Sequence, residues 1–139
     1  MQANFAPAQL WLGRTYQELG EYDAAIEGFS TVEATMPEWP VAIAARGFVE
    51  GAAGRVAKAV ATLTQLNELS QRRFVTQYGI ALVEAGLGRT DGAFATLEAA
   101  FNERSHWLMW LRLDPRWRDM RSDLRFARLI ARLHYPDQT

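Results

Sequence analysis

The sequence predicts an all-α fold of three helical hairpins closed by a C-terminal capping helix, and three observations predict it. First, the 139-residue chain aligns with itself without a gap when it is shifted by 34 residues. Second, apolar residues recur within each unit at the i, i+4, i+7 spacing of amphipathic helices. Third, a glycine recurs at the same place in every unit, where one helix ends and the next begins. The three units cover residues 6–39, 40–73 and 74–107.

The repeat keeps the size of the residue at several positions. The junction glycine is Gly20, Gly54 and Gly88 in the three units. Other positions in register are Ala25, Ala59 and Ala93; Ile26, Val60 and Phe94; Phe29, Leu63 and Leu97; Val32, Leu66 and Ala100; and Gly13, Gly47 and Ala81. A glycine inside a helix costs about 1 kcal/mol relative to alanine, so its recurrence indicates that two helices approach closely there. The pattern therefore favours packed hairpins over unrelated helices.

Each unit is divided at its glycine into two helices. In the first unit, Leu12, Tyr16 and Leu19 share one helical face before the glycine, and the residues after it follow the same spacing. The glycine closes the first helix because it adopts a left-handed conformation without a Cβ penalty. Applied to all units, the pattern predicts helices over residues 7–19, 22–35, 40–53, 56–70, 74–87 and 90–103.

The remainder of the chain breaks the repeat, and residues 107–135 are predicted to cap the array. An apolar segment, Trp107 to Leu111, is followed by the turn Asp114-Pro115. Ser122-Asp123 predicts the N-cap of an amphipathic helix, which His134-Tyr135-Pro136 ends. Because the last hairpin of an array has no following unit, we expect the apolar residues of this tail to cover it.

The first unit resembles the tetratricopeptide repeat. The residues that carry the resemblance are Leu12-Gly13-x-x-Tyr16-x-x-x-Gly20-x-Tyr22-x-x-Ala25-x-x-x-Phe29-x-x-Val32-x-x-x-x-Pro37. The later units depart from the motif, since Arg46 stands where the family favours Leu, and Glu50 and Glu84 stand where it favours Tyr. Arg46 and Glu50 lie four residues apart on one helix, so we expect an ion pair between them. The resemblance implies that residues 1–139 form a single domain, a right-handed superhelix of three such hairpins. It also implies a non-catalytic module for protein–protein interaction.

The tail resembles a C-terminal signature that follows such repeats in bacterial multidomain regulators. The matching string is Leu111-x-x-Asp114-Pro115-Arg116-Trp117-x-x-Met120-Arg121-Ser122-Asp123-x-Arg125-Phe126-x-x-Leu129, with Leu124 where the signature usually has Pro. In those proteins the array lies behind a winged-helix transcriptional domain, a Ser/Thr kinase or a nucleotide cyclase. The resemblance implies the repeat part of a signalling or transcriptional regulator. The alternative is a sensor domain that binds a small apolar ligand or peptide in its groove.

In arrays of this family the first helix of each unit lines a concave groove. The partner-binding residues that the resemblance implies are Leu10, Arg14, Gln17, Ala44, Phe48, Tyr78 and Leu82. Some members hold the terminal carboxylates of a peptide with Lys, Asn and Arg at these places, whereas this groove carries only Arg14. A largely apolar groove favours a hydrophobic peptide, a helix, an upstream repeat or the chain's own tail. If a partner binds there, we expect Phe48, Tyr78 and Leu82 to form its apolar floor.

Other function classes find little support in the composition. The chain has no cysteine, and His106 and His134 lack metal-ligand spacing. No phosphate loop, dinucleotide fingerprint or nucleophile elbow occurs, so we expect no enzyme, no cofactor and no metal. No apolar run is long enough to cross a membrane, and the N-terminus lacks the features of a signal peptide. We therefore expect a cytoplasmic protein without a membrane partner.

Charge is distributed unevenly along the chain. The formal net charge is −1, but residues 1–71 carry four basic and eight acidic side chains and residues 72–139 carry eleven and eight. Residues 104–139 contain eight Arg that alternate with aromatic residues, as in surfaces that bind single-stranded nucleic acid. The favoured interpretation is that these Arg stack on aromatic rings and pair with Asp114, Asp119 and Asp123. We expect a protein or peptide partner, with the chain's own upstream domain or a second copy as open alternatives.

Overall fold

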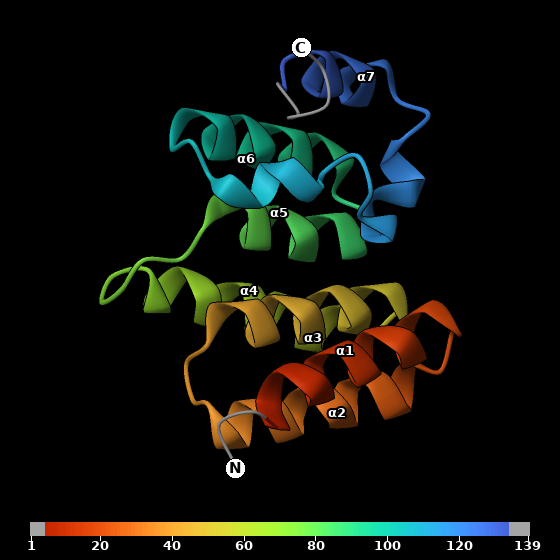
Figure 1. The fold of residues 1–139 in the computed structure, drawn as a ribbon, viewed down its shortest axis with the longest axis vertical. Coiled ribbons are helices and arrows are strands. Elements are labelled where there is room, and N and C mark those ends of the chain that lie inside the picture. The colour runs from red at the N-terminus through yellow and green to blue at the C-terminus, as the bar shows by residue number, and fades with distance from the viewer. Residues whose placement is uncertain (1–4, 134–139) are drawn as a thin grey trace.

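The structure, a computed structural model, describes residues 5–133, and within that range it contains helices and no strands. Six helices form three hairpins, α1 (Phe5–Glu18) with α2 (Tyr22–Thr35), α3 (Pro40–Ala52) with α4 (Val56–Leu69), and α5 (Gln77–Gly86) with α6 (Thr90–Asn102). The hairpins stack in chain order along the long axis of the molecule (Figure 1). The fold is that of a helical-hairpin superhelix followed by a C-terminal helix, as the sequence predicts.

The predicted helices are confirmed, with the largest difference at the start of α5. The sequence predicts a helix from residue 74, whereas α5 begins at Gln77. Two side chains fix this later start, because Thr76 Oγ1 accepts a hydrogen bond from the Tyr78 amide (3.3 Å) and Glu103 Oε1 accepts one from the Gln77 amide (2.8 Å). They satisfy two of the backbone N–H groups that every helix N-terminus leaves free.

The three junction glycines have the backbone conformation that the repeat predicts. The φ angles of Gly20, Gly54 and Gly88 are +78°, +80° and +77°. Side chains with a Cβ rarely adopt this region, so the glycine is required by the turn and not by lack of space, since nothing lies within 4 Å of an added Cβ.

Replacing Gly54 with Val is expected to lower the free energy of unfolding by about 1–2 kcal/mol, because a β-branched residue resists a positive φ. Urea denaturation measures the effect. Gly54→Asn is the matched control and should cost less, since Asn enters the left-handed region more readily. Equal stability of the Val variant and the parent chain would show that the turn does not depend on this conformation.

Small residues let neighbouring helices approach closely, as expected. A Cβ added to Gly47 would lie 2.8 Å from Thr62 Cγ2 and 2.8 Å from Val83 Cγ2, so this position sits between α4 and α5. A second close approach was not predicted from the sequence. Gly51 and Gly86 bring the backbones of α3 and α5 together, because a Cβ on Gly86 would lie 2.5 Å from the carbonyl oxygen of Phe48.

The tail consists of two 3-10 helices and one α-helix. They are η2 (His106–Trp110), η3 (Pro115–Met120) and α7 (Leu124–Ala131). Asp123 caps α7 as predicted, since its side chain accepts a hydrogen bond from the Arg125 amide (2.9 Å). The predicted stop at His134-Tyr135-Pro136 lies outside the described residues. No helix within residues 5–133 has the length and apolar character to cross a membrane.

α7 runs parallel to α6 and keeps the 34-residue register. Arg125 pairs with Asp91 (2.9 Å) and Arg132 pairs with Glu98 (2.5 Å), two contacts that each span 34 residues. Both guanidinium groups also lie over aromatic rings of α6, 4.4 Å from the ring centroids of Phe94 and Phe101. The predicted stacking of tail Arg on aromatic rings is therefore confirmed. α7 occupies the place of the second helix of a fourth unit.

The tail shares one apolar core with the third hairpin. Its buried residues in that core are Leu108, Leu111, Trp117, Met120, Phe126 and Leu129. They pack against the buried residues of α5 and α6, among them Leu82, Phe94 and Leu97. Trp117 and Leu111 are completely buried. The last hairpin is thus covered by the chain itself, which is the role that the sequence predicts for the tail.

Candidate functional site

The tail crosses the side of the stack that the first helices α1, α3 and α5 form. Arg118 of η3 forms an ion pair with Glu18 at the end of α1. Trp107 and Arg116 line a small cavity with Ala44 of α3 and other residues of α3 and α5. The groove that the sequence predicts as a binding site is therefore occupied in part by the chain's own residues, one of the alternatives that its apolar character left open.

Asp114 holds the tail in this groove. The Tyr78 hydroxyl donates to Asp114 Oδ2 at 2.7 Å, and the Trp117 indole N–H donates to the Tyr78 oxygen at 2.8 Å. Arg116 donates to both carboxylate oxygens, from Nε at 2.9 Å and from Nη2 at 2.8 Å. Arg14 of α1 approaches Oδ1 at 3.5 Å. One buried carboxylate therefore connects the tail to the first and third hairpins.

The local sequence explains how this carboxylate is placed. Asp114 is the N-cap of η3, and its side chain accepts a hydrogen bond from the Arg116 amide at 3.1 Å. Pro115 follows at the first helical position, where its fixed φ suits a helix start. Arg121 Nη2 donates to the carbonyl oxygen of Asp114 at 2.8 Å and so closes the turn. The sequence predicts a turn at Asp114-Pro115 but does not indicate that Asp114 anchors the tail.

Electrostatics favour the ionised form of Asp114. Burial alone would raise the pKa of its carboxyl, but the hydrogen bonds and charge of Arg116, with the Tyr78 hydroxyl, bring that pKa below its ordinary value. Burial and the neighbouring carboxylate raise the pKa of Tyr78, so its hydroxyl stays protonated and donates. Burial and the charge of Arg116 lower the pKa of Arg14 without bringing it near neutrality.

Asp114→Asn is expected to destabilise the fold by about 2–4 kcal/mol at neutral pH, because Arg116 and Tyr78 lose the charge that they surround. The pKa of Asp114 is lower in the folded than in the unfolded chain, so its stabilisation is present above about pH 4 and is lost as pH falls through the folded value. The melting temperatures of the parent chain and of Asp114→Asn should therefore converge when the pH falls below the pKa of Asp114 in the folded chain. Asp119→Asn, at an exposed position of the same segment, is the control and should cost much less stability at neutral pH.

Five of the seven predicted groove residues are buried. They are Leu10, Gln17, Ala44, Tyr78 and Leu82. The tail, and not an open groove, covers Tyr78 and Leu82, which belong to the core of the third hairpin. Arg14 and Phe48 remain partly exposed. Gln17 donates to Glu18 at 3.2 Å, and its buried Oε1 has no hydrogen-bond partner among the described residues.

The cavity left between groove and tail is small. It measures about 30 Å³ and is lined mostly by apolar residues. A volume of this size holds about one water molecule, whereas pockets for small organic ligands measure about 300–1,000 Å³. The apolar-ligand sensor that the sequence left as an alternative finds no support in this cavity.

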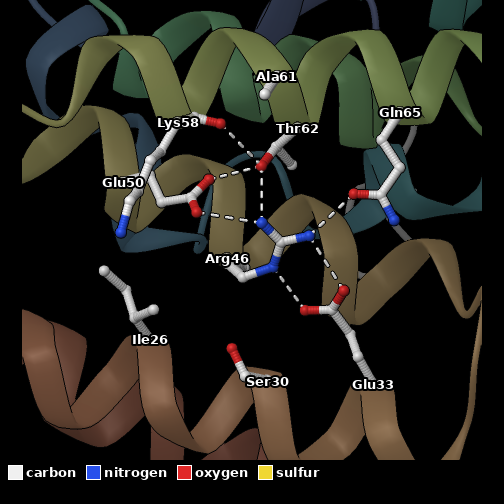
Figure 2. Close-up of a pocket in the computed structure, with 9 residues that line it drawn as sticks. All are labelled: Ile26, Ser30, Glu33, Arg46, Glu50, Lys58, Ala61, Thr62 and Gln65. Atoms are coloured by element: carbon white, nitrogen blue, oxygen red, sulfur yellow. Dashed lines mark hydrogen bonds and ion pairs between the residues drawn. The ribbon is translucent and has the colours of Figure 1, made fainter.

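A larger pocket of about 500 Å³ opens between α2, α3 and α4, and Arg46 lies at its centre (Figure 2). Arg46 Nη1 donates to Glu50 at 3.0 Å, which confirms the predicted ion pair. The same guanidinium donates to both carboxylate oxygens of Glu33, at 2.6 and 3.0 Å, and to Thr62 and Gln65 at 2.8 and 2.9 Å. Burial alone would lower the pKa of Arg46, but the hydrogen bonds and charge of Glu33 raise it.

These contacts use all five N–H groups of Arg46, so the guanidinium has none left for a ligand in the pocket. The network instead links α3 to the second helices on both sides of it. Thr62 also donates to Glu50 at 2.5 Å, and Thr96 donates to Glu84 at 2.5 Å one repeat later. The sequence already indicates that these two Glu have a shared role, because Glu50 and Glu84 depart from the repeat motif at the same position.

The fold and the site together define a helical-repeat scaffold whose C-terminal end and part of whose groove are covered by its own tail. A family model described as tetratricopeptide repeat matches residues 7–34, which form most of the first hairpin. This match and the all-helical fold support a tetratricopeptide repeat protein. Such repeats generally mediate protein–protein interactions and are typically non-catalytic.

The chain matches none of the curated proteins and none of the solved structures with which it was compared. The resemblance of the tail to bacterial multidomain regulators therefore rests on its sequence alone.

Proposed function

We propose that this chain is a non-catalytic protein-interaction module that binds a peptide or helix in the part of the groove that the tail leaves open. The observation that carries the proposal is the position of Arg14 and Phe48. They hold equivalent places in the first and second units, 34 residues apart, and both remain partly exposed while Leu82, the third equivalent, is buried. A groove that is apolar and half covered suits a short segment with apolar side chains.

The domain organisation and the biological context belong to the same proposal. We place residues 1–139 in one domain, with repeats over 6–39, 40–73 and 74–107 and a cap over 107–135, of which residues 134 and 135 lie outside the described part. The tail signature supports a place as the repeat part of a bacterial signalling or transcriptional regulator. In that setting the open half of the groove serves a partner protein in the cytoplasm or an upstream domain of the same regulator.

Site-specific photo-crosslinking tests the groove. A benzophenone analogue of phenylalanine at position 48 is expected to form one dominant adduct in cells, and Arg14→Glu in the same chain should reduce that adduct at least about 10-fold. The matched control carries the same analogue at Val56, an exposed position on α4. Equal adducts at positions 48 and 56, or an adduct indifferent to Arg14→Glu, would contradict the assignment of the groove.

Peptides that end in an acidic residue with a free carboxylate are expected to bind weakly, with Kd above about 100 μM. Arg14 is the single basic residue among the predicted groove positions, and it already faces Asp114. Fluorescence anisotropy of labelled peptides at low and high salt measures this. Tight, salt-sensitive binding that Arg14→Ala abolishes would show that Asp114 does not compete for the guanidinium.

A further inference from the structure

Helix α1 has two apolar faces, and one of them has no partner within the described residues. The first face, which includes Ala6, Leu10 and Gly13, is buried. The second face consists of Ala8, Trp11, Leu12 and Thr15 and is continued by Leu19, which directly follows the helix, at the helical spacing i, i+3, i+4, i+7 and i+11. We call these five residues the α1 stripe. All five are exposed, with 62%, 46% and 69% of Trp11, Leu12 and Leu19 accessible, and none of them is charged.

The internal repeat shows what this face is built to do. Counted 34 and 68 residues further on, the stripe corresponds to Ala42, Ala45, Arg46, Val49 and Ala53 and to Thr76, Gly79, Ile80, Val83 and Leu87. Within these two sets Ala42, Val49 and Val83 are completely buried. None of the ten is classed as exposed.

The preceding hairpin is what covers these equivalent positions. Arg46 reaches back to Glu33 of α2, and Ala42, Ala45 and Val49 share a core with residues of α2. In the third unit, a Cβ on Gly79 would lie 3.3 Å from the Cβ of Ala44 on α3. The α1 stripe is therefore the same stacking surface as the one between hairpins, left open at the first unit. An apolar stacking surface of this kind requires a cover.

We propose that a second copy of this chain supplies the cover, with α1 of each copy packed antiparallel on the other about a two-fold axis. In this arrangement α1 of the second copy packs on the α1 stripe in the way that α2 packs on the equivalent face of α3. A two-fold interface must be self-complementary, so residue i faces residue j and residue j faces residue i.

Four of the five stripe residues meet this condition when facing residues have numbers that sum to 27, and Trp11 lies beside these pairs. Ala8 then faces Leu19 of the second copy, so a small side chain meets a large one, and Leu12 faces Thr15. The Thr15 hydroxyl is satisfied within its own helix, because it donates to the Trp11 carbonyl oxygen at 2.9 Å. Thr15 therefore contributes its methyl group to an apolar contact.

Electrostatics allow the two copies to meet. The charged neighbours of the stripe, Arg14 and Glu18, form ion pairs with Asp114 and Arg118 of their own chain. Their pairing limits repulsion between like charges across the two-fold axis. The Arg14 guanidinium also lies 4.9 Å from the centre of the Trp11 ring, which helps to fix that ring in position.

Sedimentation velocity between about 5 and 500 μM tests the assembly, since an interface of one helix per chain is expected to dissociate in that range. The parent chain should shift from monomer to dimer, and Leu19→Glu should raise the dimer dissociation constant at least about 10-fold by placing a charge in an apolar contact. Leu113→Glu is the matched control, because Leu113 is also a leucine that is 69% exposed and lies far from α1 in the sequence. This control should dimerise like the parent.

Disulfide cross-linking tests the register, and the absence of cysteine makes single thiols unambiguous. Chains with Ala8→Cys and chains with Leu19→Cys should form a mixed disulfide when they are combined and oxidised. Chains that carry only one of the two cysteines should not cross-link to one another. Positions 8 and 19 lie eleven residues apart, about 16 Å along a helix. Because position 8 of one copy faces position 19 of the other, the two copies of position 8 are separated by the same distance, and so are the two copies of position 19.

A chain that stays monomeric at every concentration overturns the proposal, as does a dimer that Leu113→Glu disrupts and Leu19→Glu leaves intact. Cross-linking of Ala8→Cys chains to one another would overturn the antiparallel register. The groove test uses Phe48 and Arg14 and reads a partner adduct, whereas this test uses Ala8 and Leu19 and reads self-association. Either proposal can therefore fail without the other.

Discussion

A chain that ends at Ser105 is expected to aggregate or to lose cooperative unfolding. The truncation removes six buried tail residues, from Leu108 to Leu129, and uncovers Tyr78, Leu82 and Phe94 on the third hairpin. Burial of one large apolar side chain contributes about 1.5–3 kcal/mol as an upper estimate. Six such side chains together match the whole stability of a typical small domain, about 5–15 kcal/mol. The loss should be visible in size-exclusion chromatography and in thermal melts followed by circular dichroism.

Two further variants separate this effect from the mere shortening of the chain. Removal of residues 136–139 is the control and should leave the melting temperature unchanged. Trp117→Ala keeps the full length but empties a completely buried position, so it should cost about 3–5 kcal/mol. A soluble, monomeric 1–105 fragment that melts cooperatively would show that the tail is a detachable arm and not part of the core.

Gly86→Ala is expected to destabilise the fold by about 2–3 kcal/mol, although alanine is the better helix former. The added Cβ would lie 2.5 Å from the carbonyl oxygen of Phe48 and 3.0 Å from its Cα. These are backbone atoms, so no side chain can rotate away and helices α3 and α5 have to separate. Gly28→Ala is the control, because its Cβ would meet only the backbone of Gly13 at 3.5 Å, an ordinary contact. That variant should be neutral or stabilised by up to about 1 kcal/mol.

A double variant identifies the cause of the effect. Gly51 faces Gly86 across the same crossing, where its Cβ would lie 2.5 Å from the Gly86 carbonyl carbon. Once α3 and α5 have separated to admit one methyl group, the second should add little. The double variant Gly51→Ala/Gly86→Ala should therefore cost less than the sum of the single variants in urea denaturation. Strict additivity would mean that the two glycines act at independent sites.

The tail and the glycines show which structural features are local. The helix positions and the three left-handed glycines follow from the sequence because each depends on neighbours within a few residues. The 34-residue register follows from comparison of the chain with itself. The N-cap at Asp123 and the Arg46–Glu50 ion pair follow for the same reason, since both join residues at most four apart. The expectation that the tail covers the third hairpin also follows, because an array with apolar residues at its end needs a cover.

Only the tertiary structure decided which residues fill the groove and which residues outside α3 bind Arg46 in addition to Glu50. Tyr78 meets Asp114 across 36 residues and Arg14 meets it across 100, contacts that no periodicity predicts. The close approach of Gly51 and Gly86 also depends on how two hairpins cross. Position 7 of each unit illustrates the difference between what the sequence determines and what the tertiary structure determines. The sequence shows Leu12, Arg46 and Ile80 there, but whether such a residue is exposed, ion-paired or buried depends on the helix in front of it, because burial is a property of the neighbours and not of the residue.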